Sequence, residues 1–556
     1  MNTAIHSGAA APSAAAGMSA ASRDSSASAP ASPGAAADFS RLGMTLRHLG
    51  RVVDEQPGGR RALAGLTTAQ VKDLLFLPLT SASQLSLCQQ MHAEGGSGVG
   101  VATWFVSHAW MCVFVELLEA LEHFFASEPL GLDTVIWLDL VSTSQHATFS
   151  RPPEWWRQTF MLAIQSLGNM VMVMCPWDRP VTLTRAWCVL ELYACCSSGC
   201  RFEIALPQTQ RAQLTRDLMY KNDAFFDFLA NIHSESSECS RSTDRASIFA
   251  AVRASVGFAG LDALVRRTLE VWMLRLLGGK IDEARAAGNE VDVMNWLNAL
   301  GSLNLDLGMN SEALCLFEEA VKIGMRVLGT GDQTFLVLMS NTANAYMRNG
   351  QHARALALNK EVMASERLVR GMEHAHTLKT MSNIAAGYIE TNDLALGVPL
   401  MEEALSIQRR VLGDDHEDTL NSMLALALTC YTQGDYAAAE VKFDQVEPIM
   451  QRALGAQHPK TLNASLFRVL LLLRTARVDE AQPLAAATCE AFASVLGPSH
   501  PITMQSAFVA ALTLFYGGHI DAPALSTAWL EHRDQMGSVV NKDLQREYEV
   551  ALGSRA

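Results

Sequence analysis

A short glycine-containing junction recurs at constant spacing in the second half of this 556-residue chain. The segments GMEHAHTL, GDDHEDTL, GAQHPKTL and GPSHPITM begin at Gly371, Gly413, Gly455 and Gly497, a step of 42 residues each time, and Gly329 (GTGDQTF) extends the series backwards. A fixed period of this length is typical of a solenoid, in which each repeat is one supersecondary unit stacked on its neighbours. We therefore expect a repeat array over residues 288–538.

Three further columns in the same register predict what each unit contains. One column marks where a helix must end and turn, and four of its six members are glycine: Gly308, Gly350, Asn392, Gly434, Ala476 and Gly518. Two columns carry small side chains that let helices approach closely: Ala313, Ala355, Gly397, Ala439, Ala481 and Pro523 in one, and Gly301, Ala343, Ala385, Ala427, Val469 and Ala511 in the other. About six helix pairs should stack into an all-α superhelix with a concave groove, and Pro523 indicates an irregular last unit.

These columns and the LG..HP.TL junction resemble tetratricopeptide repeats (TPR) of the long kind found in kinesin light chains. The resemblance implies a groove that binds a peptide or protein partner, and it does not imply a motor function. Asn341 and Asn383 are equivalent positions in the first helices of two units. Their amides would either hydrogen-bond an extended peptide backbone or bond one helix to the next.

One histidine column, His374, His416, His458 and His500, could be mistaken for a metal site. Each repeat adds two helices that pack about 8–10 Å apart, whereas zinc ligands must each bring a nitrogen to about 2.1 Å from the ion. We therefore predict no metal there. The expected role is local: each histidine, with the threonine three residues later (Thr377, Thr419, Thr461 or Thr503), forms the turn and cap that start a unit.

Residues 101–207 alternate between short apolar runs and amphipathic stretches. We predict strands at 101–107, 133–141, 170–176 and 202–207, and helices at 111–125, 153–167 and from about 181. Apolar strands separated by helices are typical of a parallel sheet covered on both faces, so we expect a small doubly wound α/β domain. Around it we expect a disordered Ala/Ser-rich leader (1–38), a helical preamble (39–100), a helical bridge (208–287) and a C-terminal cap or tail (539–556).

Ligands of a doubly wound sheet collect at the carboxyl ends of its strands. Those ends supply His108 and Trp110 after the first strand and Trp177 after the third. On the next helix Trp187 and Glu191 are four residues apart and share one face. FVSHAW followed by an apolar strand and RAWCVLEL resembles a Toll/interleukin-1 receptor (TIR) domain, although SHAW replaces the Arg- or acid-containing segment usual after the first strand.

The TIR resemblance implies two further properties. Some TIR domains hydrolyse NAD, and carrying this over makes Glu191 the catalytic carboxylate that holds a ribose hydroxyl and stabilises oxocarbenium-like charge. His108, Trp110, Trp177, Trp187 and Arg185 would bind the substrate, and no cofactor is required. TIR domains also self-associate. The alternative is a non-catalytic adaptor, in which Glu191 is solvated or paired with Arg185 or Arg179.

Composition and charge argue against several other classes of protein. A net charge of −14 argues against a phosphate-covering, nucleic-acid-binding protein, and no apolar stretch reaches the roughly 18–20 residues that span a bilayer. The eleven cysteines lack framework spacing and indicate reduced thiols; Cys195, Cys196 and Cys200 are interpreted as the end of a buried helix. We expect a cytoplasmic signalling scaffold, with organelle targeting by the leader left open.

Overall fold

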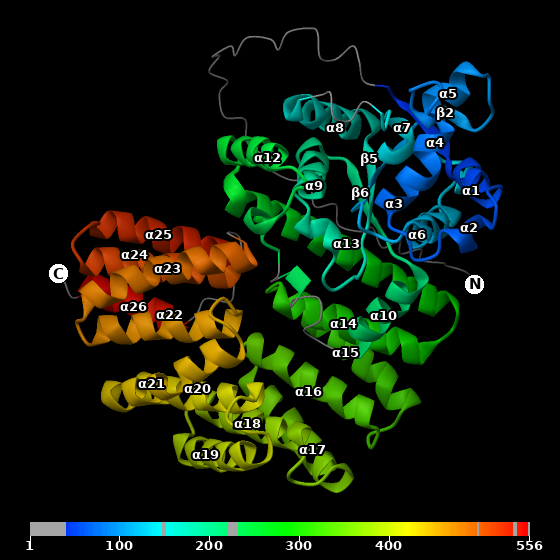
Figure 1. The fold of residues 1–556 in the computed structure, drawn as a ribbon. Helices are drawn as coiled ribbons and strands as arrows, with labels where there is room; N and C mark the ends of the chain where they lie inside the picture. The colour runs from blue at the N-terminus through cyan, green and yellow to red at the C-terminus, as the bar shows by residue number, and fades with distance from the viewer. Residues whose placement is uncertain are drawn as a thin grey trace, which may run out of the picture. The chain divides into compact units, whose positions relative to one another are not determined.

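The computed structural model describes residues 40–146, 152–220, 228–229, 232–497, 500–536 and 542–553 (Figure 1). The predicted leader, residues 1–38, lies outside the described residues. Within the described chain an α/β domain is followed by a long connecting helix and an array of helix pairs, as the sequence predicts.

The α/β domain contains one six-stranded sheet in the order β2-β1-β4-β3-β5-β6. Its strands are β1 (Leu42–Thr45), β2 (Val99–Val101), β3 (Trp104–Ser107), β4 (Val135–Leu138), β5 (Asn169–Val173) and β6 (Arg201–Ala205). The last four strands run parallel. This confirms the four predicted strands, each shorter than the apolar run that indicated it.

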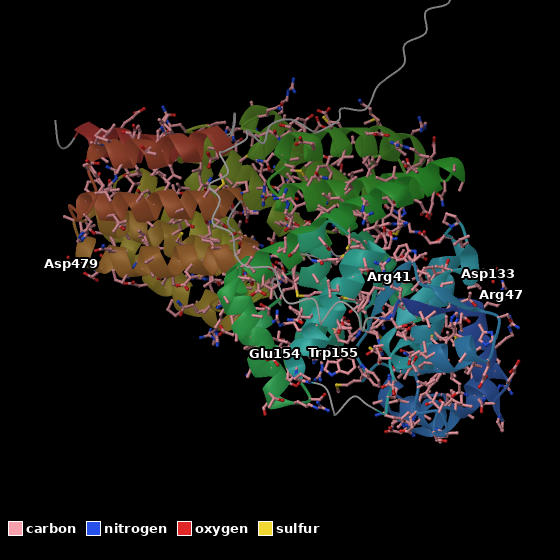
Figure 2. All side chains as sticks on the ribbon, turned by 90° about the horizontal axis from the view of Figure 1, so that it is seen from above. Arg41, Arg47, Asp133, Glu154, Trp155 and Asp479 are labelled. Carbon is pink, nitrogen blue, oxygen red and sulfur yellow. The ribbon has the colours of Figure 1, made fainter. Side chains whose placement is uncertain are left out.

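The segment 39–100 is not purely helical, which corrects its assignment as a helical preamble. Strand β1 pairs antiparallel with both β2 and β4, so this segment extends the sheet by two strands. The four residues of β1 give no apolar run, and Gly43 is required because a Cβ there would collide with the carbonyl of Ile136. An ion pair reinforces the contact: Arg47 donates to both carboxylate oxygens of Asp133 at 2.7 and 3.0 Å, just before β4 (Figure 2).

Helices cover both faces of the sheet, as a doubly wound fold requires (Figure 1). The helices of this domain are α1 (Leu46–Asp54), α2 (Gly59–Ala62), α3 (Thr68–Val71), η1 (Lys72–Phe76), α4 (Leu77–Leu79), α5 (Leu87–Ala93), α6 (Phe114–Ala126), η2 (Gly131–Asp133), α7 (Asp139–Ser142), α8 (Pro153–Leu167), η3 (Val181–Thr184) and α9 (Ala186–Ser198). Alternate residues of β3 serve the two faces. Val106 joins the core beneath α6, whereas Phe105 stacks on Trp137 and meets Phe160 of α8 on the opposite face.

The predicted bridge, residues 208–287, is mostly helical where it is described, with a short extended stretch around residue 238. It contains α10 (Gln208–Tyr220), η4 (Ser234–Ser236), α12 (Ser242–Ala254) and the 30-residue α13 (Gly257–Ala286). Helix α13 contacts α9 and β6 on one side and the first repeat helix, α14, on the other. No single described helix is long and apolar enough to cross a bilayer. Among the described helices, only α12 and α13 taken together have the length and apolar composition of a membrane span, and they are bent by 87° relative to each other.

Six helix pairs follow α13, as the 42-residue period predicts. They are α14 (Glu290–Asp306) with α15 (Asn310–Val327), α16 (Gln333–Arg348) with α17 (His352–Val369), α18 (Ala375–Glu390) with α19 (Leu394–Val411), α20 (Glu417–Thr432) with α21 (Tyr436–Ala453), α22 (Pro459–Arg474) with α23 (Val478–Leu496), and α24 (Pro501–Tyr516) with α25 (Ala522–Met536). All six members of the turn column have positive φ, including Asn392 (63°) and Ala476 (58°). The register therefore identified each left-handed turn even where glycine is replaced.

The histidine column caps helices, as predicted. In His374, His416, His458 and His500 the ring accepts a hydrogen bond from the backbone N–H two residues later. The threonine column does not take part in this cap, which corrects that half of the prediction. Thr377, Thr419, Thr461 and Thr503 are buried against the preceding helix or the core, because a residue three positions into a helix points back towards its neighbour.

Contacts between distant repeats also join the ends of the array. The His500 ring lies 2.9 Å from the carbonyl of Asp306 at the end of α14, and Pro501 packs on the turn at Gly308. Arg266 of α13 donates to the carbonyls of Ser494 and Val495 at the end of α23. The first and last pairs are thus in contact, which a nearest-neighbour solenoid does not require.

A final helix, α26 (Lys542–Gly553), lies in the predicted C-terminal cap. Tyr548 stacks on Trp529 of α25, and buried Glu547 accepts hydrogen bonds from Tyr431 and Arg474. This helix covers apolar surface of the last repeats.

Candidate functional site

The carboxyl group of Glu191 meets the end of strand β3. Ser107, the last residue of β3, donates a 2.6 Å hydrogen bond from Oγ to Glu191 Oε2. Glu191 lies in the middle of α9 and is only 8% exposed. The start of α9 is fixed by residue 238, whose main chain accepts from Ala186 N–H and donates to the Thr184 carbonyl. Glu191 therefore lies at the carboxyl end of β3 with its side chain buried.

Burial changes the ionisation of this carboxyl group. It raises the pKa of Glu191 from 4.5 to about 8, the nearby charge of Asp139 raises it further, and the Ser107 hydrogen bond opposes the rise. No described arginine or lysine forms an ion pair with it. The expected alternative partners are engaged elsewhere: Arg185 lies by Glu238 and Ser240, and Arg179 lies by Asp178. Glu191 is therefore mostly a neutral acid at pH 7.

A second carboxyl group lies beside the first. Asp139 follows β4 and accepts a 2.9 Å hydrogen bond from Trp110 Nε1. His108 Nδ1 is 3.7 Å from the other Asp139 oxygen, and the buried His108 Nε2 has no hydrogen-bond partner among the described residues. Burial lowers the pKa of His108, so its ring is neutral. The ends of β3 and β4 thus bring together predicted His108 and Trp110 with Asp139.

The remaining predicted substrate residues are placed differently. Trp187 packs edge-on against Phe160 at 5.5 Å and donates to Asp244 of α12 at 3.4 Å. Trp177 is held by α10, donating to Asp217 at 3.2 Å, and is 5% exposed. Trp187 lies on the same helix as Glu191 and makes these contacts with α8 and α12, whereas Trp177 makes its contacts with α10.

The cysteines near this site are not suited to nucleophilic or metal chemistry. Burial raises the pKa of Cys188 well above its ordinary range, and its thiol donates to the carbonyl of His108. At the end of α9, Cys195, Cys196 and Cys200 each contact a different non-sulfur group. Among the described residues no group of three or more His, Cys, Asp or Glu side chains could hold a metal ion.

A row of asparagines follows the first helices of the repeats. Its members are Asn295, Asn298, Asn341, Asn344, Asn383, Asn421 and Asn463. The two helices that carry a pair have its members three residues apart, so each pair shares a face, and successive first helices contact one another. All are at least partly exposed.

The two predicted asparagines differ in how they are bonded. Asn341 donates to Asn298 on the preceding first helix at 2.9 Å, which is the helix-to-helix alternative. Asn383 is half-buried, and no side-chain hydrogen bond joins it to another described residue. The same holds for Asn295, Asn344, Asn421 and Asn463 within the described chain. Five amides on this face are therefore free to bind a ligand.

Several of these residues were absent from the predicted site. Ser107 and Asp139 stood at predicted strand ends, but residue spacing could not assign their partners, which are Glu191 on α9 for Ser107 and Trp110 after β3 for Asp139. Asp244 lies 57 residues after Trp187, and no spacing pattern links the two. The other asparagines could have been found from the period, because Asn295, Asn421 and Asn463 fall in one column.

Comparison with known families supports the repeat half of the chain. A tetratricopeptide repeat profile matches residues 378–452. This region carries TPR repeats, which are protein-interaction modules. No curated protein sequence matches the chain significantly.

Solved structures with similar folds cover parts of the chain. One is a Podospora anserina protein described as a kinesin light chain with nearly identical TPR-like repeats, at 26% identity and TM-score 0.29 over 36% of this chain and 94% of that one. BtubC from P. vanneervenii is 16% identical, with TM-score 0.33 over 40% and 91%. A Rap protein complexed with competence and sporulation factor is 13% identical, with TM-score 0.44 over 62% and 91%.

Proposed function

We propose that this chain is a scaffold that binds a protein partner, as an extended segment, along the first helices of its repeats. The observation that carries the proposal is the row of five asparagine amides without partners in the described chain. A primary amide offers two donors and one acceptor, which match the main chain of an extended peptide irrespective of its side chains. The TPR match at residues 378–452 supports the same role.

A randomised twelve-residue peptide library tests the proposal. Peptides selected on the full chain should bind it saturably in fluorescence anisotropy. Asn383→Ala and Asn421→Ala should each weaken binding by roughly three- to ten-fold, the effect of one lost hydrogen bond. Gln445→Ala removes an exposed amide from α21, a second helix, and should leave binding unchanged. Equal binding by all variants, or failure to select any peptide, would refute the proposal.

A second function is proposed for the α/β domain: cleavage of NAD to nicotinamide and an ADP-ribose product. Its support is the buried Glu191 carboxyl group at the parallel strand ends, next to Ser107 and Asp139. Ionised, this group would hold a ribose hydroxyl and stabilise positive charge on the sugar. Nicotinamide leaves as a neutral molecule, so no second acid is needed. Placing the cationic nicotinamide ring of NAD beside Glu191 would favour ionisation of its carboxyl group.

Nicotinamide release from NAD, followed by chromatography, tests this second function. The assay compares the full chain with Glu191→Gln and with Glu238→Gln, an exposed carboxylate outside the strand ends. Release that persists in the control and disappears in a folded Glu191→Gln variant supports the enzyme. We also propose that the α/β domain self-associates, so light scattering accompanies each assay and reports whether the chain is assembled. No release from an assembled chain leaves a non-catalytic adaptor.

A further inference from the structure

A cavity of about 730 Å³ lies at the free edge of the sheet. Strand β6 and helices α6, α10, α13 and α14 line it. The volume is within the range of about 300–1,000 Å³ that small-molecule sites occupy. It contains none of the residues that surround Glu191, so it is a separate space.

Two tryptophans give this cavity large apolar walls. Trp272 comes from α13 and Trp296 from α14. Leu206, Leu214 and Leu218 complete the apolar lining from the end of β6 and from α10. Flat aromatic walls favour a ligand with a flat apolar body.

The basic residues of the cavity differ in whether they have a hydrogen-bond or ion-pair partner. Arg275 is engaged by Glu203 at 3.0 Å and by the Phe202 carbonyl at 2.9 Å, and Lys280 is engaged by Glu283 at 2.6 Å. Arg211 has no ion pair or side-chain hydrogen bond with another described residue, and its Nε is buried without a partner. Glu119 is close enough to act on it only through space.

The buried Nε–H of Arg211 is shielded from water and gains no hydrogen bond from the described protein, which costs free energy, while the side chain as a whole is only partly buried. Burial lowers the pKa of Arg211, which reflects the cost of keeping its charge out of water. Carboxylate, sulfonate and phosphate groups match the guanidinium fork and form charge-assisted hydrogen bonds with it.

We propose that this cavity binds a small organic anion, with its charged group on Arg211 and its flat apolar body against Trp272 and Trp296. Such a ligand would contact both the sheet and the first repeat helix. It would therefore stabilise the contact between the α/β domain and the repeats. This site is independent of the asparagine row and of Glu191.

Two neighbouring glycines on α13 provide a matched pair of variants. Gly279 lines the cavity, and a Cβ added there meets no atom within 4 Å. Gly278 is equally unobstructed but does not line the cavity. Leucine is a far better helix former than glycine, so both variants should fold. Because only residue 279 lines the cavity, Gly279→Leu should fill it and Gly278→Leu should not.

The test is a fluorescence titration of the full chain with 1-anilinonaphthalene-8-sulfonate, a sulfonate on a flat naphthalene ring. We expect saturable binding that Arg211→Gln weakens by roughly ten-fold or more, as for loss of a charge-assisted hydrogen bond. Gly279→Leu should weaken binding at least as much, and Gly278→Leu should bind like the unaltered chain. No saturable binding, equal binding by the two leucine variants, or full affinity in Arg211→Gln would overturn the proposal.

Competition then identifies the anion. 1-Naphthoate and 1-naphthyl phosphate carry a carboxylate and a phosphate on the same ring, and the stronger competitor identifies the preferred group. Neutral 1-naphthalenemethanol should compete at least ten-fold less well. Equal competition by the neutral compound would show that the apolar walls alone bind ligands and would overturn the role of Arg211.

Discussion

Replacing Glu191 by glutamine should stabilise the protein, and the gain should depend on pH. In the folded chain the carboxyl group is buried and its pKa is about 8, whereas an unfolded chain restores the ordinary value of 4.5. The raised pKa means that folding keeps a proton that the unfolded chain releases. Stability from the neutral form is thus complete below pH 4.5 and is lost as pH rises towards about 8.

The magnitude follows from the difference between those two values. Each pH unit between 4.5 and about 8 costs the natural chain about 1.36 kcal/mol, which gives about 5 kcal/mol in total. Glutamine has nearly the same volume and its carbonyl can accept from Ser107, but it has no charge to bury. Glu191→Gln should therefore exceed the unaltered chain in unfolding free energy by about 1 kcal/mol at pH 5 and by about 4 kcal/mol at pH 8.

Urea unfolding at pH 5, 6, 7 and 8 provides the measurement. Tryptophan fluorescence reports chiefly on the α/β domain, because seven of the ten tryptophans lie between Trp104 and Trp187. Glu238→Gln serves as the control, since that side chain is 80% exposed, and it should show no trend with pH. A constant difference between Glu191→Gln and the natural chain at every pH would mean that Glu191 is ionised in the folded state, and the reasoning would fail.

Three further predictions concern catalysis, the turns and the joined ends of the repeats. If the Glu191 carboxylate cleaves NAD, kcat/KM for nicotinamide release should rise about ten-fold per pH unit up to about pH 8 and level off above it; a flat profile would exclude that carboxylate. Ala476→Gly should raise the unfolding free energy by about 0.5–1 kcal/mol, because Ala476 has a φ of 58°, where a Cβ is strained. Gly434→Ala should lower it by about 1 kcal/mol, because it adds a Cβ at a φ of 81°. Urea denaturation in which both changes act in the same direction would contradict this. Arg266→Met should cost about 1–3 kcal/mol of unfolding free energy, because it leaves two carbonyls at the end of α23 without donors, and it should speed hydrogen exchange there. Arg253→Met, at an exposed side chain, should cost under about 0.5 kcal/mol. Equal exchange in both variants would show that Arg266 does not fix this end.

The repeats could be predicted in detail because the turn position and the small-residue positions recur in every unit at the same spacing. Asn392 and Ala476 alone would not indicate a left-handed turn, yet their register with Gly350 and Gly434 places them there. The threonine column was misread because a threonine near a helix start fits both a cap and a core position. Only the packing of the preceding helix distinguishes the two.

The α/β half was less predictable, since each of its strands occurs once. Strand β1 escaped notice because LGMT has no apolar run, and its place in the sheet comes from pairing with β4, about ninety residues away. The structure places Glu191 at the end of β3, and its role in NAD cleavage stays a prediction. The sequence could not assign Ser107 as its partner or Trp177 to α10, because both contacts depend on how helices cross the sheet.

The contacts between the first and last repeats bear on how a partner would bind. An open solenoid has only nearest-neighbour interfaces, so its binding face changes curvature and a ligand must offset the entropy of fixing it. Here His500 meets Asp306, and Arg266 holds the end of α23 from 228 and 229 residues away in the chain. These long-range bonds fix both ends of the asparagine row before a ligand arrives. Loosening them through Arg266→Met should therefore weaken peptide binding, although Arg266 lies on α13, outside the first helices that carry the row.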